Sequence, residues 1–174
     1  LNKNSLHDPR VRVTNADAFV WLDNVSTDAF DFVIIAFPDS NNFALGKLYT
    51  SAFYRLLEKR LSARGLIAIQ STSPPYARQS FWCVVTTLED VGFKTAPYQA
   101  LVPSFGEWGY IIAGRQEFAP VAVDLPKTRF LTAETIPLLF NFPADMARVP
   151  AEVNRLNNQV LVRYFEQDWR KVVR

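Results

Sequence analysis

The 174-residue sequence contains one cysteine, one histidine and no long apolar run. Cys83 has no second cysteine to pair with, which favours a reducing compartment such as the cytoplasm. His7 has no further histidine or cysteine that could complete a ligand set, so we expect no metal site. No apolar run reaches the roughly 18 residues of a membrane-spanning helix, so we do not expect this chain to cross a membrane by itself.

The charges are balanced and dispersed. The chain has 19 lysines and arginines against 17 aspartates and glutamates, a formal net charge of +2. This balance argues against nucleic-acid binding as the main function, because nucleic-acid-binding surfaces concentrate basic residues. A hydrophobic share of 49% is enough for the core of one domain.

Two short apolar runs predict the strands around which the chain is organised. Residues 32–37 are apolar and rich in β-branched side chains, which predicts a strand buried on both faces. This run ends in a turn-forming cluster that contains Asp39. A second run, residues 66–69, ends at Gln70. Ligands of open α/β sheets bind at the carboxyl ends of such strands, so we expect Asp39 and Gln70 to lie side by side at one sheet edge.

Periodicity and capping signals predict the remaining elements. They are a strand at 11–14, a short helix capped by Asp17, a helix from about Leu45 to Ala63 with Gly65 as its C-cap, a helix from Ala77 to Val91 that stops at Gly92, an antiparallel strand pair at 95–102 and 110–114, a short helix from Thr132, and a final helix from Pro150 to about Val172.

The alternation of strands and helices predicts an α/β fold, the second half of a doubly wound sheet that ends in an antiparallel strand pair and C-terminal helices. We expect a partial Rossmann-like domain over residues 1–125. Residues 126–174 would form a helical extension packed on it.

Four stretches carry a resemblance to a known family: DPRVRVTNADAFVWL (8–22), FDFVIIAFPDSNNFALGKLYTSAFY (30–54), GLIAIQSTSP (65–74) and VPSFGEWGYIIAG (102–114). They resemble the catalytic domain of spermidine synthases, the polyamine aminopropyltransferases. Within that family, the chain is similar to bacterial members whose domain follows a membrane-embedded N-terminal region. The resemblance implies the fold of class I S-adenosylmethionine-dependent methyltransferases and a place in the cytoplasm, at the inner face of the membrane in the longer protein.

The resemblance also implies the reaction and its site. An aminopropyl group would pass from decarboxylated S-adenosylmethionine to putrescine or another polyamine, with methylthioadenosine as product. By position, Asp17 and Ala18 match the pair that holds the adenine, although Asp17 could equally be only a helix cap. Asp39 matches an aspartate that binds the polyamine amines, and Gln70 matches an active-site glutamine.

Two aromatic residues are weaker candidates for polyamine contact. Phe105 lies near a position where the family often has a tyrosine that touches the polyamine. Tyr49, on the helix after the Asp39 loop, would either face the cleft or pack in the core.

The family's catalytic aspartate, which deprotonates the attacking amine, falls on Ala36. An amine with a pKa of roughly 10 is protonated at neutral pH and has no lone pair for attack. A methyl side chain cannot accept its proton, and general-base assistance is worth about 10²–10⁴-fold. Natural loss of activity, an introduced substitution and a changed substrate are all compatible with Ala36.

We expect the family's glycine-rich cofactor loop and the acid of the second strand to lie upstream of Leu1. The sheet would then have an exposed edge, which predicts self-association or an edge covered by the C-terminal helix. Two main functional hypotheses remain. One is an aminopropyltransferase domain active only within a longer chain, and the other is a non-catalytic remnant that binds a polyamine, a nucleoside or nothing. A methyltransferase on the same fold is a minor third option.

Overall fold

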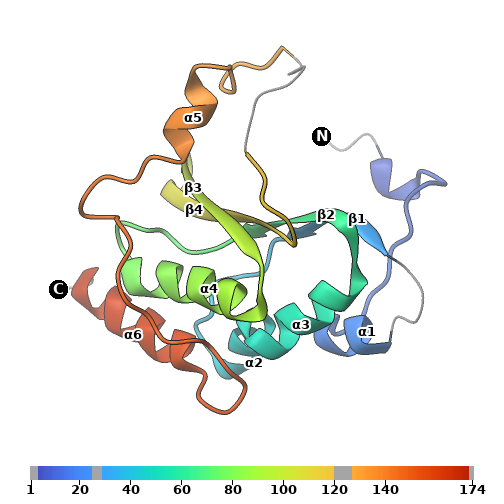
Figure 1. Ribbon diagram of the computed structural model, residues 1–174, viewed down its shortest axis with the longest axis horizontal. Helices are drawn as coiled ribbons and strands as arrows, with labels where there is room; N and C mark the ends of the chain where they lie inside the picture. Colours follow the sequence, from blue (N-terminus) through green and yellow to red (C-terminus); the bar gives the residue numbers. More distant parts are fainter. Residues whose placement is uncertain (1–3, 25–28, 120–126, 173–174) are drawn as a thin grey trace.

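A four-stranded sheet with helices packed on one face forms the centre of the protein (Figure 1). The computed structural model describes residues 4–24, 29–119 and 127–172. The sheet order is β1-β2-β4-β3, with β1 parallel to β2 and the other two pairs antiparallel. The strands are β1 (Phe30–Ile35), β2 (Leu61–Gln70), β3 (Lys94–Val102) and β4 (Gly106–Gly114). The predicted α/β class and the predicted antiparallel pair are therefore confirmed.

Helices precede, connect and follow the strands. Among the described residues they are η1 (Ser5–His7), α1 (Ala18–Asn24), α2 (Phe43–Gly46), η2 (Lys47–Tyr49), α3 (Ser51–Arg60), α4 (Arg78–Val91), α5 (Thr135–Leu139) and α6 (Val160–Val172). Helix α4 ends as predicted, because Gly92 adopts the left-handed conformation with φ 105°. None of the helices in these described ranges is long and apolar enough to cross a membrane.

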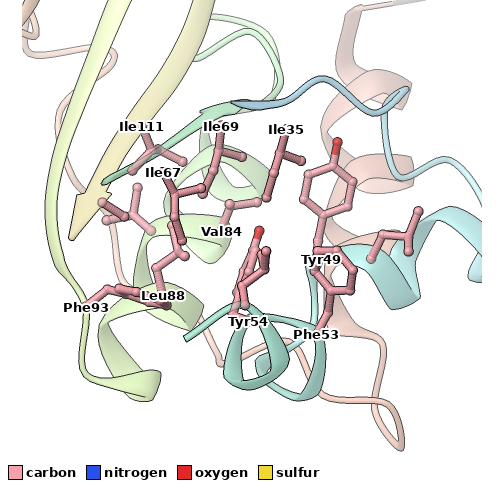
Figure 2. Close-up of a cluster of buried hydrophobic side chains, with 14 of the residues drawn as sticks. Ile35, Tyr49, Phe53, Tyr54, Ile67, Ile69, Val84, Leu88, Phe93 and Ile111 are labelled. Carbon is pink, nitrogen blue, oxygen red and sulfur yellow. The ribbon is translucent and has the colours of Figure 1, made fainter. Parts of the chain in front are cut away.

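The core lies between the inner face of the sheet and helices α3 and α4 (Figure 2). Alternate residues of the strands point to this face, and the apolar stripes of the two helices cover them. Full burial of one such side chain contributes about 1.5–3 kcal/mol. The labelled members are Ile35, Ile67, Ile69, Ile111, Phe53, Tyr54, Val84, Leu88, Phe93 and Tyr49.

Two strand predictions are wrong. Residues 11–14 form no strand and are exposed, because the alternating pattern there meets no neighbouring strand. Strand β1 is buried on one face only: Phe32 is 57% exposed and Ile34 is 72% exposed. Helix α6 does not cover the free edge of β1 as one prediction had it, since it packs mainly against α4 (Figure 1).

The predicted helix 45–63 is interrupted and ends early. Thr50 has extended backbone and its side chain caps α3 by accepting a hydrogen bond from the Phe53 amide. Helix α3 ends at Arg60, and Gly65 lies inside β2 instead of capping a helix. A Cβ on Gly65 would lie 2.7 Å from the carbonyl oxygen of Phe30, so the close pairing of β1 and β2 explains this glycine.

The C-terminal region also differs from the prediction. The final helix begins at Val160, ten residues later than predicted, because residues 151–159 form an irregular segment whose backbone is bonded by side chains. Helix α6 packs on α4, within the same body as the sheet. The boundary predicted between residues 125 and 126 lies outside the described residues.

Gly109 lies where β4 crosses the loop after β2. Its carbonyl accepts from the Ser71 amide at 3.0 Å, and its own amide donates to the Thr72 carbonyl at 3.2 Å. A Cβ here would lie 2.5 Å from Cε2 of Phe81. The same Cβ would lie 2.7 Å from the carbonyl oxygen of Thr72, so the close approach of β4 to the loop after β2 requires glycine at this position.

We predict that Gly109→Ala lowers the free energy of unfolding by about 1–3 kcal/mol, the usual cost of overpacking. Urea unfolding of the single variants and of the double variant with Phe81→Leu measures this. The cost should be smaller in the Phe81→Leu background, because the ring is one of the obstacles. An equal cost in both backgrounds would contradict the steric explanation.

Candidate functional site

The parallel pairing of β1 and β2 places their carboxyl ends together. Ile35 is opposite Ile69 in the ladder, so Ala36 and Gln70 follow at the same edge. Ala36 is exposed. The loop 36–42 then leads to α2, where the Asn42 side chain caps the helix by accepting from the Leu45 amide at 3.0 Å. The structure therefore brings Ala36, Asp39 and Gln70 to one edge, as their positions in the sequence suggest.

Tyr49 holds this loop from inside the protein. Its hydroxyl lies 3.2 Å from the carbonyl oxygen of Phe37 and 3.1 Å from that of Pro38, and donates to them. Its ring packs edge-on against the Phe37 ring at 6.2 Å. Burial and the neighbouring Asp39 both raise the pKa of Tyr49, which keeps its hydroxyl protonated as a donor. Tyr49 is thus a core residue that also fixes the residues just before Asp39.

Asp39 is half-buried in the middle of the loop 36–42. Burial raises the pKa of its carboxyl from 3.8 to about 6, and the Thr72 hydroxyl partly offsets the rise. The Thr72 hydroxyl makes no hydrogen bond of regular geometry within the described residues. A small recess of about 10 Å³ is lined by Asp39, Ser40, Tyr49, Ser71, Thr72, Ser80, Val84 and Leu161. A half-buried carboxylate of this kind suits a cationic ligand, because a positive charge offsets its lost hydration.

The β3–β4 hairpin reaches past the end of β2 on the same side. The Ser73 hydroxyl donates to the Glu107 carbonyl at 2.6 Å and holds the hairpin against the loop after β2. Phe105, at the tip, is 67% exposed, and its ring lies 5.7 Å from that of Trp108. The tip therefore carries an exposed aromatic surface at the edge where β1 and β2 end.

Asp17 caps α1, which is one of the two roles predicted for it. Its Oδ1 accepts from the amides of Phe19 at 2.9 Å and Val20 at 3.2 Å. Its Oδ2 forms an ion pair of 2.7 Å with Lys47, which lowers the pKa of the Asp17 carboxyl. Asp17 and Ala18 are thereby tied to η2, which continues directly from α2 after the Asp39 loop. Their predicted adenine contact remains a prediction.

Sequence reasoning missed Lys47 and Thr72 as neighbours of the candidate site. Lys47 reaches Asp17 across 30 positions of sequence, and Thr72 approaches Asp39 from the loop after β2. Neither position carries a local signal in the sequence. In the described part of the chain, no group of three or more histidine, cysteine or acidic residues could hold a metal ion.

The raised pKa of Asp39 predicts a pH-dependent stability. The folded state holds this proton more tightly than the unfolded state, so the contribution of Asp39 falls as pH rises from about 4 to about 6. Above pH 6 the half-buried charge costs roughly 1–2 kcal/mol, less than the full pKa shift implies because solvent screens the carboxylate. Asp39→Asn should therefore stabilise the protein at pH 7.5 and flatten this part of the pH profile in urea unfolding. Asp31→Asn, at an exposed site, is the control, and a profile unchanged by Asp39→Asn would contradict the assignment.

Comparison with known proteins shows the family. The spermine/spermidine synthase domain matches residues 1–124. The polyamine aminopropyltransferase 2 of Ralstonia nicotianae is 53% identical over 100% of this chain and 34% of its own length. The polyamine aminopropyltransferase of Leptospira interrogans is 47% identical over 99% of this chain and 34% of its own length. The chain thus spans about a third of these relatives.

Solved structures agree on the fold. A spermidine synthase in complex with the transition state analogue AdoDATO matches with a TM-score of 0.67 and 23% identity, over 79% of this chain and 50% of that one. The spermidine synthase from Thermotoga maritima matches with a TM-score of 0.63 and 20% identity, over 79% and 48% of the two chains. The fold is therefore that of class I S-adenosylmethionine-dependent methyltransferases. With its sequence and fold in agreement, the chain belongs to the spermine/spermidine synthase domain family.

Proposed function

We propose that this chain is the polyamine-binding part of an aminopropyltransferase that acts on putrescine or another polyamine, with decarboxylated S-adenosylmethionine as co-substrate. The half-buried Asp39 beside Gln70 at the carboxyl edge of the sheet carries this proposal. Relatives that are named polyamine aminopropyltransferases, with about half of their aligned residues identical, support it. The activity would belong to a longer polypeptide, since this chain covers a third of those relatives. The resemblance of the sequence further suggests that a membrane-embedded region precedes the domain, which would lie on the cytoplasmic side.

In this proposal Asp39 binds an ammonium group of the polyamine. The recess beside it is lined by hydroxyl groups and apolar side chains, so the carboxylate is the charged group there. Phe105 would cover the methylene chain from the hairpin tip. Asp17 and Ala18 would meet the adenine of the co-substrate at the start of α1.

Aminopropyl transfer then requires loss of a proton from the attacking amine. The amine nitrogen forms a bond to the carbon beside the sulfonium, the carbon–sulfur bond breaks, and methylthioadenosine leaves with the electron pair. A base must take the proton of the amine. Ala36 supplies no base at the edge where it lies beside Gln70. We therefore expect binding of the amine with weak or no transfer.

The exposed methyl of Ala36 also favours a second function, a polyamine-binding domain without catalysis. Calorimetry with methylthioadenosine separates the possibilities, because tight binding of this nucleoside is expected of an aminopropyltransferase and would contradict a polyamine-binding domain without catalysis. Putrescine binding that weakens below about pH 6, as Asp39 takes up its proton, is expected for both. No binding of putrescine at pH 7.5 would contradict both.

We predict that Ala36→Asp strengthens putrescine binding at least tenfold, because a second carboxylate would face the ammonium group. In the longer protein the same change should raise the rate of transfer by about 10²–10⁴-fold. Ala36→Asn, similar in shape and uncharged, is the matched control for the binding titration. Equal affinity of the two variants would contradict a role for charge at this position.

The free edge of β1 supports self-association of this chain. Among the described residues β1 pairs only with β2, and Phe32 and Ile34 are exposed on it. Such an edge invites pairing with another chain, and a lysine opposes it.

Ile34→Lys should therefore shift sedimentation velocity profiles toward the monomer over a concentration series. Leu101→Lys is the control, since Leu101 is 63% exposed on β3 at the opposite edge. A wild-type chain that stays monomeric, or equal effects of the two lysines, would argue against association through β1.

A further inference from the structure

We propose that Asn154 is a positioning residue for the loop that carries Asp39, and that it acts through Tyr49 and Leu161. This inference concerns the site of the proposed function, but its test needs no polyamine. Asn154 lies in the irregular segment between α5 and α6 and is fully buried. Buried amides of this kind are costly unless every polar group is bonded.

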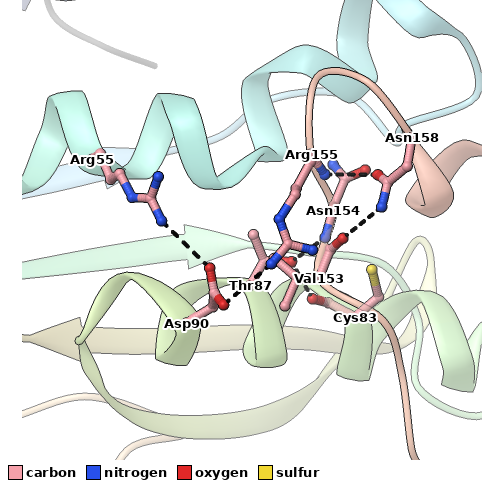
Figure 3. A network of polar contacts seen from close by, with 8 residues as sticks. All are labelled: Arg55, Cys83, Thr87, Asp90, Val153, Asn154, Arg155 and Asn158. Carbon is pink, nitrogen blue, oxygen red and sulfur yellow. Dashed lines mark hydrogen bonds and ion pairs between the residues drawn. The ribbon is translucent and has the colours of Figure 1, made fainter.

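All the polar groups of Asn154 have partners. Its side-chain Nδ2 donates to the carbonyls of Gly46 and Tyr49, each at 3.1 Å. Its Oδ1 accepts from the Leu161 amide at 3.3 Å. Its backbone amide donates to the Thr87 hydroxyl at 2.9 Å, as Figure 3 shows. One residue thus joins the end of α2, η2, α4 and the first turn of α6.

Two of the three residues held by the Asn154 side chain are walls of the recess beside Asp39. Tyr49 and Leu161 line that recess together with Asp39. Tyr49 is bonded to Asn154 through its carbonyl, and its hydroxyl is the group that holds the carbonyls of Phe37 and Pro38. A shift of the Tyr49 backbone would therefore move the hydroxyl that fixes the loop immediately before Asp39.

Gly46 shows how closely this region is packed. A Cβ on Gly46 would lie 2.7 Å from Cγ2 of Val162 and 3.0 Å from Oε1 of Gln159. The end of α2 therefore lies directly against the start of α6, and Asn154 bridges the two. The carboxyl edge of the sheet is thus fixed from the C-terminal part of the chain, over 100 residues away in sequence.

The test is the pKa of the Asp39 carboxyl, measured by carbon NMR in the ligand-free protein. In Asn154→Ala we expect the walls of the recess to move apart and water to reach the Asp39 carboxyl. The pKa of this carboxyl should then fall by about one unit, from about 6 toward 3.8. Tyr49 faces Asp39, and Asp168 reaches the recess through Ser80. Both ionisable groups are retained in this variant.

Asn158→Ala is the matched control. Asn158 lies in the same segment, and its side chain bonds only to backbone groups of Val153, Arg155 and Val160 among the described residues. Loss of these bonds should lower stability without moving the pKa of Asp39. An equal pKa shift in both variants would reduce Asn154 to a general structural role and overturn the proposal.

Tyr49→Phe keeps the ring and removes the hydroxyl through which Asn154 acts on the loop. It keeps the test decisive if Asn154→Ala does not fold. We expect the pKa of Asp39 to fall in Tyr49→Phe as well, and an unchanged pKa there would overturn the proposal. Failure of putrescine to bind would contradict the proposed function and leave this result unaffected.

Discussion

The ladder between β1 and β2 runs in parallel register from Phe32 with Leu66 to Ile35 with Ile69. Both strands therefore end at one edge, and the loops that leave them must lie side by side. Ile35 and Ile69 are buried against α3 and α4, which fixes the register, because a slip by one residue would expose them. The position of Asp39 relative to Gln70 follows from this pairing.

Two residues of the C-terminal region, Asn154 and Asp168, support this edge through the helices next to it. Asn154 bonds the end of α2 and η2, and Asp168 of α6 accepts from both the amide and the hydroxyl of Ser80 in the first turn of α4. A carboxylate there suits the positive end of the helix. The site is consequently built from three regions that are distant in sequence: the ends of β1 and β2 with the loops that follow them, the first turn of α4, and the segment from Asn154 to α6.

Short apolar runs and glycine stops were enough to predict β2, α4 and the pairing of β3 with β4. The prediction of residues 11–14 as a strand failed because an alternating pattern needs a partner strand, which no local signal reveals. Helix α6 begins late because Asn154 and Asn158 bond the preceding backbone in place of helical carbonyls. Asp39 was predictable from its place after a strand, whereas Lys47 and Thr72 matter only through contacts made by the folded chain.

The central claim is that a polyamine amine binds at the carboxyl edge formed by β1 and β2. Titration of isotope-labelled protein with putrescine, followed by NMR, tests it directly. We expect saturable shifts of the backbone signals of Asp39, Ser40, Gln70 and Thr72. The signals of Glu89, near the end of α4, and of Lys94, at the far end of the sheet, should stay unchanged. Saturating putrescine that leaves the first group unshifted, or that shifts both groups alike, would contradict the claim.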